Sequence, residues 1–189
     1  MGTLRRTLIK NIDKVTLSEI ITNNYKIGRT AEFDYEDRAA FLDKMNYVFI
    51  LFDAYINGWT EIEFDFYRSI EEHDDFLKKL SMEYQTIIIS GYEQTTTGDT
   101  KLLVLNNGHI LRSIYQKSYF EPHRIIMEHN LGERLQTEKH FKYSELGKDV
   151  TGYKFLNFDE VQEMFADAGY KGEARSFFDE KYLHLEYLK

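Results

Sequence analysis

The chain has 189 residues, of which 42% are hydrophobic and 15% aromatic, so it is apolar enough to fold and is not a disordered protein. It contains no cysteine, which excludes disulfides, zinc-thiolate sites and a cysteine nucleophile. Its net charge of −8 and pI of about 5.3 give no concentrated basic surface, so we expect no nucleic-acid partner. Without a linker, repeat or low-complexity segment, the sequence predicts a single domain over residues 1–189.

The first residues of the chain do not resemble an export signal. Arg5, Arg6, Lys10 and Lys14 interrupt the short apolar stretches there. The longest apolar run, residues 47–52, is far shorter than the roughly 20 residues that span a bilayer. We therefore expect a cytoplasmic protein without a membrane partner.

Two helices are predicted in the first third of the chain. The sequence Thr16-Leu17-Ser18-Glu19 matches a capping box and predicts a short helix from Leu17 to about Asn24. A longer helix is expected to open at Asp37 and to stop at Asn57-Gly58. Its apolar residues recur at spacings of three and four, which is typical of a main core helix: Ala40, Phe41, Met45, Val48, Phe49, Phe52 and Ile56.

A strand and a third helix are predicted next. Acidic and apolar residues alternate from Glu61 to Tyr67, which is the period of a strand with one buried face and one solvent face. Ser69 is expected to cap a helix over residues 70–84. Acidic residues at the start of that helix complement its dipole, so part of the local acidity has a structural cause.

The middle of the chain predicts an antiparallel β-meander. Three strands are expected at residues 86–93, 101–105 and 110–117, joined by a turn at residues 97–99 and by the hairpin signal Asn107-Gly108. Periodicity fades between Tyr119 and Gly152, where only short strands at residues 124–127 and 140–143 are expected.

The last part of the chain predicts one more helix and one strand. The helix begins at Phe158, is capped by Asn157 or Asp159, and ends at Ala168-Gly169. Residues 182–187 alternate as an edge strand does. Together these elements predict an α+β fold, with an antiparallel β-meander packed against about three helices.

Acidic charge is concentrated in one segment. Between Glu32 and Asp75 there are 13 acidic and three basic residues, a local charge of −10, so the rest of the chain sums to +2. The segment is also rich in aromatic residues, and the combination favours a surface that binds a basic protein. The competing interpretation is a face that only keeps the protein soluble. The residues expected to contact the partner are Tyr55, Trp59, Glu61, Glu63 and Asp65.

A second candidate site lies between residues 121 and 140. Histidines and acids in this segment have the chemistry for a divalent metal or for acid–base catalysis: His123, Glu128, His129, Glu138 and His140. Their spacing matches no known ligand pattern, so we assign no metal or cofactor, and a polar loop is the competing interpretation.

Arg112 belongs to the same alternative site. If its side chain points to the core it needs a carboxylate partner, for which Glu93 and Glu138 are the candidates. We favour the other register, in which Arg112 is a solvated strand residue.

Several short motifs carry a family resemblance. They are Tyr92-Glu93-Gln94-Thr95, Gly98-Asp99, Asn107-Gly108, Leu111-Arg112, Asn130-Leu131-Gly132, Leu135 and Glu138. This pattern, over about a quarter of the chain, resembles small bacterial α+β proteins, some of which are thought to act as immunity proteins in polymorphic toxin systems. The resemblance implies a non-enzymatic protein whose sheet presents a binding surface, and it supplies no catalytic residues.

Two functional hypotheses follow. The first is a cytoplasmic interaction protein of the immunity or inhibitor kind, whose acidic, aromatic surface meets a basic partner such as a toxin. The second is a metal-assisted hydrolase or small-ligand-binding protein that uses the segment 121–140.

Overall fold

The computed structural model divides the chain into two compact units. Residues Met1–Thr7 and Leu77–Lys171 form one, here called the meander unit, and residues Leu8–Phe76 and Gly172–Lys189 form the other, here called the acidic unit. The structure describes residues 3–34, 48–52, 57–64, 70–119, 124–140, 147–148, 156–170 and 181–187. In this part of the chain, no helix is long and apolar enough to cross a membrane.

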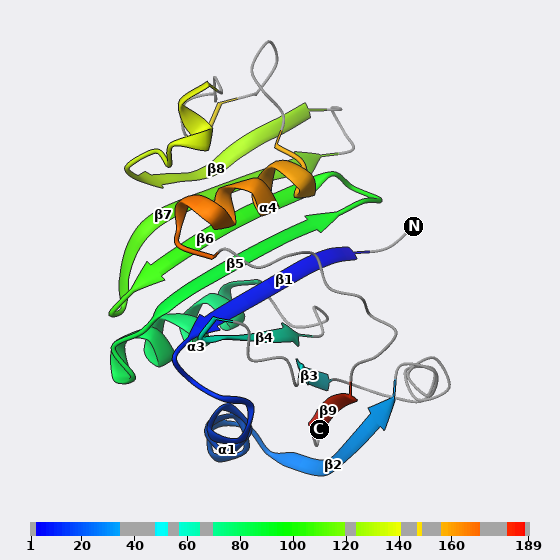
Figure 1. The fold of residues 1–189 in the computed structure, drawn as a ribbon. Helices are drawn as coiled ribbons and strands as arrows, with labels where there is room; N and C mark the ends of the chain where they lie inside the picture. Colours follow the sequence, from blue (N-terminus) through cyan, green and yellow to red (C-terminus); the bar gives the residue numbers. More distant parts are fainter. Residues whose placement is uncertain are drawn as a thin grey trace. The chain divides into compact units, whose positions relative to one another are not determined.

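The meander unit is built on four consecutive antiparallel strands (Figure 1). They are β5 (Ile87–Gln94), β6 (Asp99–Asn106), β7 (His109–Tyr119) and β8 (Arg124–Gly132). The predicted three-strand meander is confirmed, and β8 extends it as a fourth and longer strand than expected. Asn107 and Gly108, at φ 51° and 79°, adopt the left-handed conformation that a two-residue hairpin requires.

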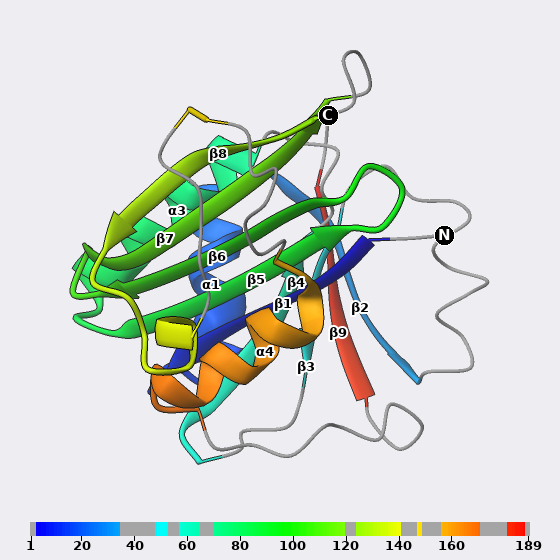
Figure 2. The same cartoon turned by 90° about the horizontal axis from the view of Figure 1, so that it is seen from above.

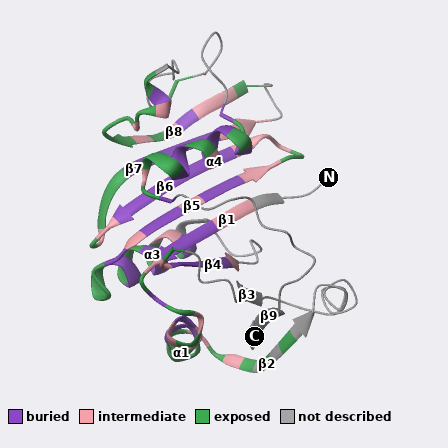
Figure 3. Ribbon diagram, viewed as in Figure 1, coloured by how far each residue is buried: buried purple, intermediate pink, exposed green. Residues whose placement is uncertain are grey.

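The helix α4 (Phe158–Asp167) covers one face of this meander (Figure 2). It begins where predicted, because Asn157 and Glu160 form a reciprocal capping box at its N-terminus. The helix approaches β5 closely at Gly91, where an added Cβ would lie 2.5 Å from Cγ1 of Val161. Strand β6 is buried along most of its length in the middle of the sheet (Figure 3).

The acidic unit contains a second group of strands. Their order is β2 (Ile27–Asp34), β9 (Lys181–Tyr187), β3 (Val48–Phe52) and β4 (Trp59–Phe64). Strand β9 pairs antiparallel with β2 on one side and with β3 on the other. It is therefore an internal strand, and the prediction of an edge strand at the end of the chain is wrong.

The prediction of a long helix between Asp37 and Ile56 is also wrong for the residues in this range that the structure describes. Residues 48–52 form β3, while residues 37–47 and 53–56 lie outside the described residues. A short apolar run cannot be assigned to helix or strand from its periodicity alone. Here the run Val-Phe-Ile-Leu-Phe is the continuous apolar sequence of a strand paired on both sides.

Smaller corrections concern the element ends. Helix α1 (Lys14–Asn24) begins earlier than predicted because Asp13 caps it, accepting a 3.0 Å hydrogen bond from the Thr16 amide. Helix α3 (Ile70–Glu83) agrees with the prediction, whereas β4 begins at Trp59, two residues before the predicted start, and residues 65–67 of the predicted strand lie outside the described residues. His140 ends the 3₁₀ turn η1 (Thr137–His140) and so does not open the predicted strand, whose residues 141–143 lie outside the described residues.

Two strands near the start of the chain were not predicted. They are β1 (Thr3–Lys10) and β2. Residues 3–7 of β1 belong to the meander unit, and residues 8–10 belong to the acidic unit.

Candidate functional site

The acidic row predicted on β4 does not lie on a solvent face. Glu61 is only 4% exposed and Trp59 only 2%, while Glu63 is half-buried. The expectation fails because the consecutive residues 59–62, which point alternately to the two faces of β4, are all buried, so both faces of the strand are covered. Alternation therefore does not separate a wet face from a dry one in this strand. Tyr55 and Asp65 lie outside the described residues.

Other carboxylates of the acidic unit do reach solvent. Glu32 on β2 and Glu72 and Asp75 on α3 are exposed. The division of charge between the two units follows the one seen in the sequence, where the segment 32–75 carries −10 and the rest of the chain +2. The acidic unit has 19 acidic and 10 basic residues, a net charge of −9, whereas the meander unit has 13 acidic and 14 basic residues, a net charge of +1.

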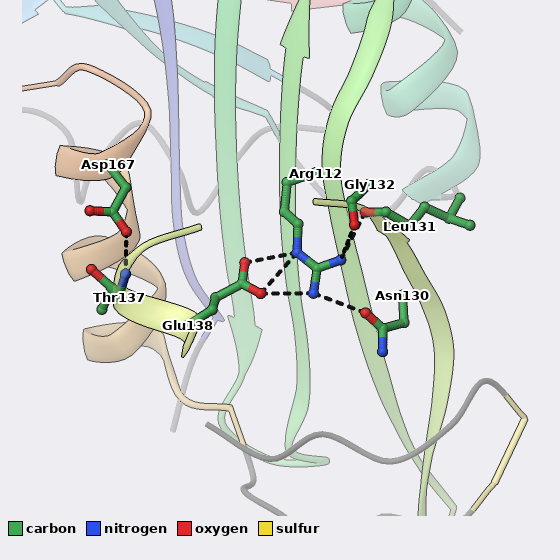
Figure 4. Close-up of polar contacts among 7 residues, drawn as sticks. All are labelled: Arg112, Asn130, Leu131, Gly132, Thr137, Glu138 and Asp167. Carbon is green, nitrogen blue, oxygen red and sulfur yellow. Dashed lines mark hydrogen bonds and ion pairs between the residues drawn. The ribbon is translucent and has the colours of Figure 1, made fainter. Parts of the chain in front are cut away.

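Arg112 lies on the face of the meander that α4 covers, and its side chain is fully buried. Its Nε and Nη2 atoms donate hydrogen bonds to the carboxylate oxygens of Glu138 at 2.8–2.9 Å (Figure 4). The remaining donors reach the carbonyl oxygens of Leu131 at 2.8 Å and Gly132 at 3.5 Å, and Oδ1 of Asn130 at 2.9 Å. The expectation of a solvated Arg112 is therefore wrong, and of the two carboxylates expected as partners of a buried Arg112, Glu93 and Glu138, the structure has Glu138.

This buried pair has no free hydrogen-bond donor to offer a ligand. A guanidinium has five N–H donors, and each has an acceptor within the chain. The backbone amide of Thr137 donates to Oδ2 of Asp167 at 2.6 Å, which attaches η1 to α4 as well (Figure 4). Glu93, the other candidate partner, instead accepts a 2.7 Å bond from the Phe158 amide. The pair therefore fixes η1 on the sheet and is a structural element.

Glu128 and His129 lie on β8 and are separated from this pair. His129 is exposed, and its ring meets the ring of Tyr115 edge-on, with centroids 5.8 Å apart. Glu128 accepts a 2.6 Å hydrogen bond from the hydroxyl of Tyr119. That hydrogen bond raises the pKa of Tyr119 above its usual value of 10.0.

The predicted alternative site is thus divided between two faces of the sheet. Arg112 and Glu138 face α4, whereas strand alternation and the pairing of Tyr115 with His129 place His129 on the opposite face. His123 lies outside the described residues, and the side chain of His140 is not described. Among the described residues, no three histidine or acidic side chains gather closely enough to hold a metal ion.

A row of polar and aromatic side chains crosses the face of the meander opposite α4. Cross-strand pairing aligns Tyr92, Lys101, Tyr115 and His129 on four neighbouring strands. The first three are buried, with Tyr92 and Tyr115 each 8% exposed and Lys101 5%. Burial, with a smaller effect of Asp99, raises the pKa of Tyr92 to about 12.

Sequence reasoning did not single out this row. Its signal is the two-residue alternation of the predicted strands, but the alignment of residues between strands depends on the register. The register includes bulges in β7 and β8 that no short sequence motif predicts.

Comparisons of the chain with family models, curated proteins and solved structures gave no match.

Proposed function

We propose that this protein is a non-enzymatic, cytoplasmic interaction protein whose acidic unit binds a basic protein partner. The observation that carries the proposal is the charge difference between the two units, −9 against +1. Such a field attracts a positively charged partner from a distance and raises the association rate, and salt screens this effect. A basic active-site cleft of a toxin is a partner of this kind, in keeping with the resemblance to immunity proteins.

The contact residues differ from those expected from the sequence. Trp59 and Glu61 are buried and therefore serve the core of the acidic unit. Exposed carboxylates are the better candidates for steering, and among the described residues of the acidic segment 32–75 these are Glu32, Glu72 and Asp75. Interfacial charges of this kind affect the association rate more than the final affinity.

The test uses the intact protein and two matched variants. The first variant carries Glu32→Gln, Glu72→Gln and Asp75→Gln in the acidic unit. The control carries Glu83→Gln, Glu133→Gln and Glu163→Gln, which change the same number of exposed acids in the meander unit. Proteins of the source cell that a cation exchanger retains are passed over each immobilised form and identified by mass spectrometry.

The expected result is one dominant basic protein that the native chain and the control capture and the first variant loses. The association rate of that protein should fall steeply between low and high salt. Equal capture by all three forms, or an association rate that does not depend on salt, would reject the proposal.

A second candidate function is small-ligand binding on the face of the meander opposite α4. The observation that favours it is the row of tyrosine, lysine and histidine side chains on that face, because convergent polar and aromatic groups are typical of ligand sites. Two residues of the sequence hypothesis are found here: His129 is a member of this row, and Glu128 precedes it on β8. Ligand-induced chemical shift changes at the His129 and Tyr115 amides would support it, and their absence across a metabolite panel would oppose it.

A further inference from the structure

Two basic side chains converge on one tyrosine at the end of β7. Nζ of Lys117 lies 5.7 Å from the ring centroid of Tyr119, and Cζ of Arg124 lies 5.9 Å from it. Tyr119 and Arg124 are paired across β7 and β8, and Lys117 precedes Tyr119 by two residues on the same face of the strand. Arg124 is exposed, and Lys117 and Tyr119 are partly exposed, so the cluster is accessible.

These contacts orient the two cations without using their hydrogen-bond donors. A cation–π contact engages the aromatic face through the positive charge, so the N–H groups stay available to an acceptor. Within the described residues, neither Lys117 nor Arg124 forms an ion pair. Neither side chain donates a hydrogen bond in that part of the chain either, so their donors are available there to an added acceptor.

Two acids near the cluster, Glu128 and Asp99, accept hydrogen bonds from neutral donors. Oε1 of Glu128 accepts the 2.6 Å hydrogen bond of the Tyr119 hydroxyl. Oδ1 of Asp99 accepts a 2.6 Å hydrogen bond from the backbone amide of Ser118. Each carboxylate is thus held in place by a group other than the two cations. Lys117 and Arg124 are both positively charged and both lie over the Tyr119 ring, so an added anion would reduce the repulsion between them.

We propose that Lys117 and Arg124, positioned by Tyr119, form a binding site for an anionic group, a phosphate or a carboxylate, carried by a small molecule. Arg124 supplies paired N–H donors that fit two oxygens of such a group, and Lys117 supplies a mobile point charge. The hydroxyl of Tyr119 keeps Glu128 from competing for the cations. The inference rests on the second candidate function and is independent of the basic protein partner.

The probes are inorganic phosphate and acetate, each titrated at constant ionic strength into the ¹⁵N-labelled full chain. The site predicts saturable shift changes at the amides of Ser118, Tyr119 and Ile125. The variant with Lys117→Gln and Arg124→Gln should bind about fivefold more weakly or worse. The control with Lys78→Gln and Lys79→Gln removes two exposed lysines from α3 and should bind as the native chain does.

A second pair of variants tests the proposed role of the Tyr119 hydroxyl, which is to keep Glu128 from pairing with the two cations. Tyr119→Phe keeps the ring but releases Glu128, which can then pair with Arg124, so anion binding should weaken although no cation is lost. Glu128→Gln should strengthen it. Both variants alter exposed or half-buried side chains and leave the core intact.

The outcomes separate the possible ligands and the possible failures. Saturation by phosphate alone identifies a phosphate site, and saturation by acetate alone identifies a carboxylate site. Shifts that are unsaturable, or equal in the Lys117 and Arg124 variant, overturn the inference. If neutral ligands move the His129 amide while neither anion binds, small-ligand binding stands and the anion site falls.

Discussion

The buried pair of Arg112 and Glu138 allows a quantitative prediction. Glu138→Ala removes both carboxylate oxygens and leaves a fully buried guanidinium with acceptors for only part of its donors. Removing one partner of a buried ion pair typically costs about 3–5 kcal/mol. A native domain has only about 5–15 kcal/mol in total. We therefore expect Glu138→Ala to lower the free energy of unfolding in urea by about 3–5 kcal/mol.

A double variant separates the pair from the packing around it. Replacing both charges, as Arg112→Met with Glu138→Leu, leaves no uncompensated charge in the core. This variant should lose much less stability than Glu138→Ala, because buried ion pairs and apolar replacements of similar volume are often nearly equivalent. Arg112 also binds two backbone carbonyls, so some loss from those acceptors is expected.

Added carboxylate provides an independent check of the same reasoning. Formate is small enough to occupy the place of the Glu138 carboxylate, so it should restore part of the stability of Glu138→Ala. It should not restore a variant that also carries Arg112→Met. A loss below about 1 kcal/mol in Glu138→Ala, the value typical of an exposed pair, would refute the assignment of a buried, structural ion pair.

Three further changes test the packing of α4 and the buried tyrosine. Gly91→Ala should destabilise the meander unit by about 1–3 kcal/mol, because the new methyl would meet Val161 at 2.5 Å; an unchanged melting temperature would contradict this close approach. Asn157→Ala should cost about 1 kcal/mol through loss of its cap on α4, measured by urea unfolding, and should leave the strands unaltered in circular dichroism. Because the pKa of Tyr92 is raised from 10.0 to about 12, folding favours its neutral form, so this contribution to stability is complete below pH 10 and falls as the pH rises towards 12. Tyr92→Phe should remove that part of the alkaline loss, and an unchanged slope between pH 10 and 12 would contradict the burial of its hydroxyl.

The elements that the sequence predicted correctly have signals contained in a few neighbouring residues. The hairpin at Asn107-Gly108 and the cap at Asn157 are of this kind, because each depends on backbone preferences within one turn. Residues 48–52 show the opposite case. Their apolar run suits a helix or a buried strand, and only pairing with distant β9 and with β4 decides between them.

The surroundings of the candidate site residues depend still more on distant parts of the chain and were therefore harder to predict. The burial of Glu61 reflects the covering of both faces of β4 by other parts of the chain, which the alternation of its own residues cannot reveal. The partner of Arg112 was among two candidates that the sequence proposed, because an arginine in the core requires a carboxylate. Which candidate was correct depended on where η1 lies on the sheet.

The position of β9 between β2 and β3 has a consequence for the order of folding. The sequence between β3 and β9 includes all four strands of the meander and α4, so this pairing closes a very long loop. Contacts of such sequence separation form slowly, because loop closure costs entropy before the contact is gained. The meander, whose strands are joined by short turns, can assemble before β9 pairs with β2 and β3. During synthesis, the exposed edges of β2 and β3 are therefore where we expect misfolding and chaperone binding to concentrate.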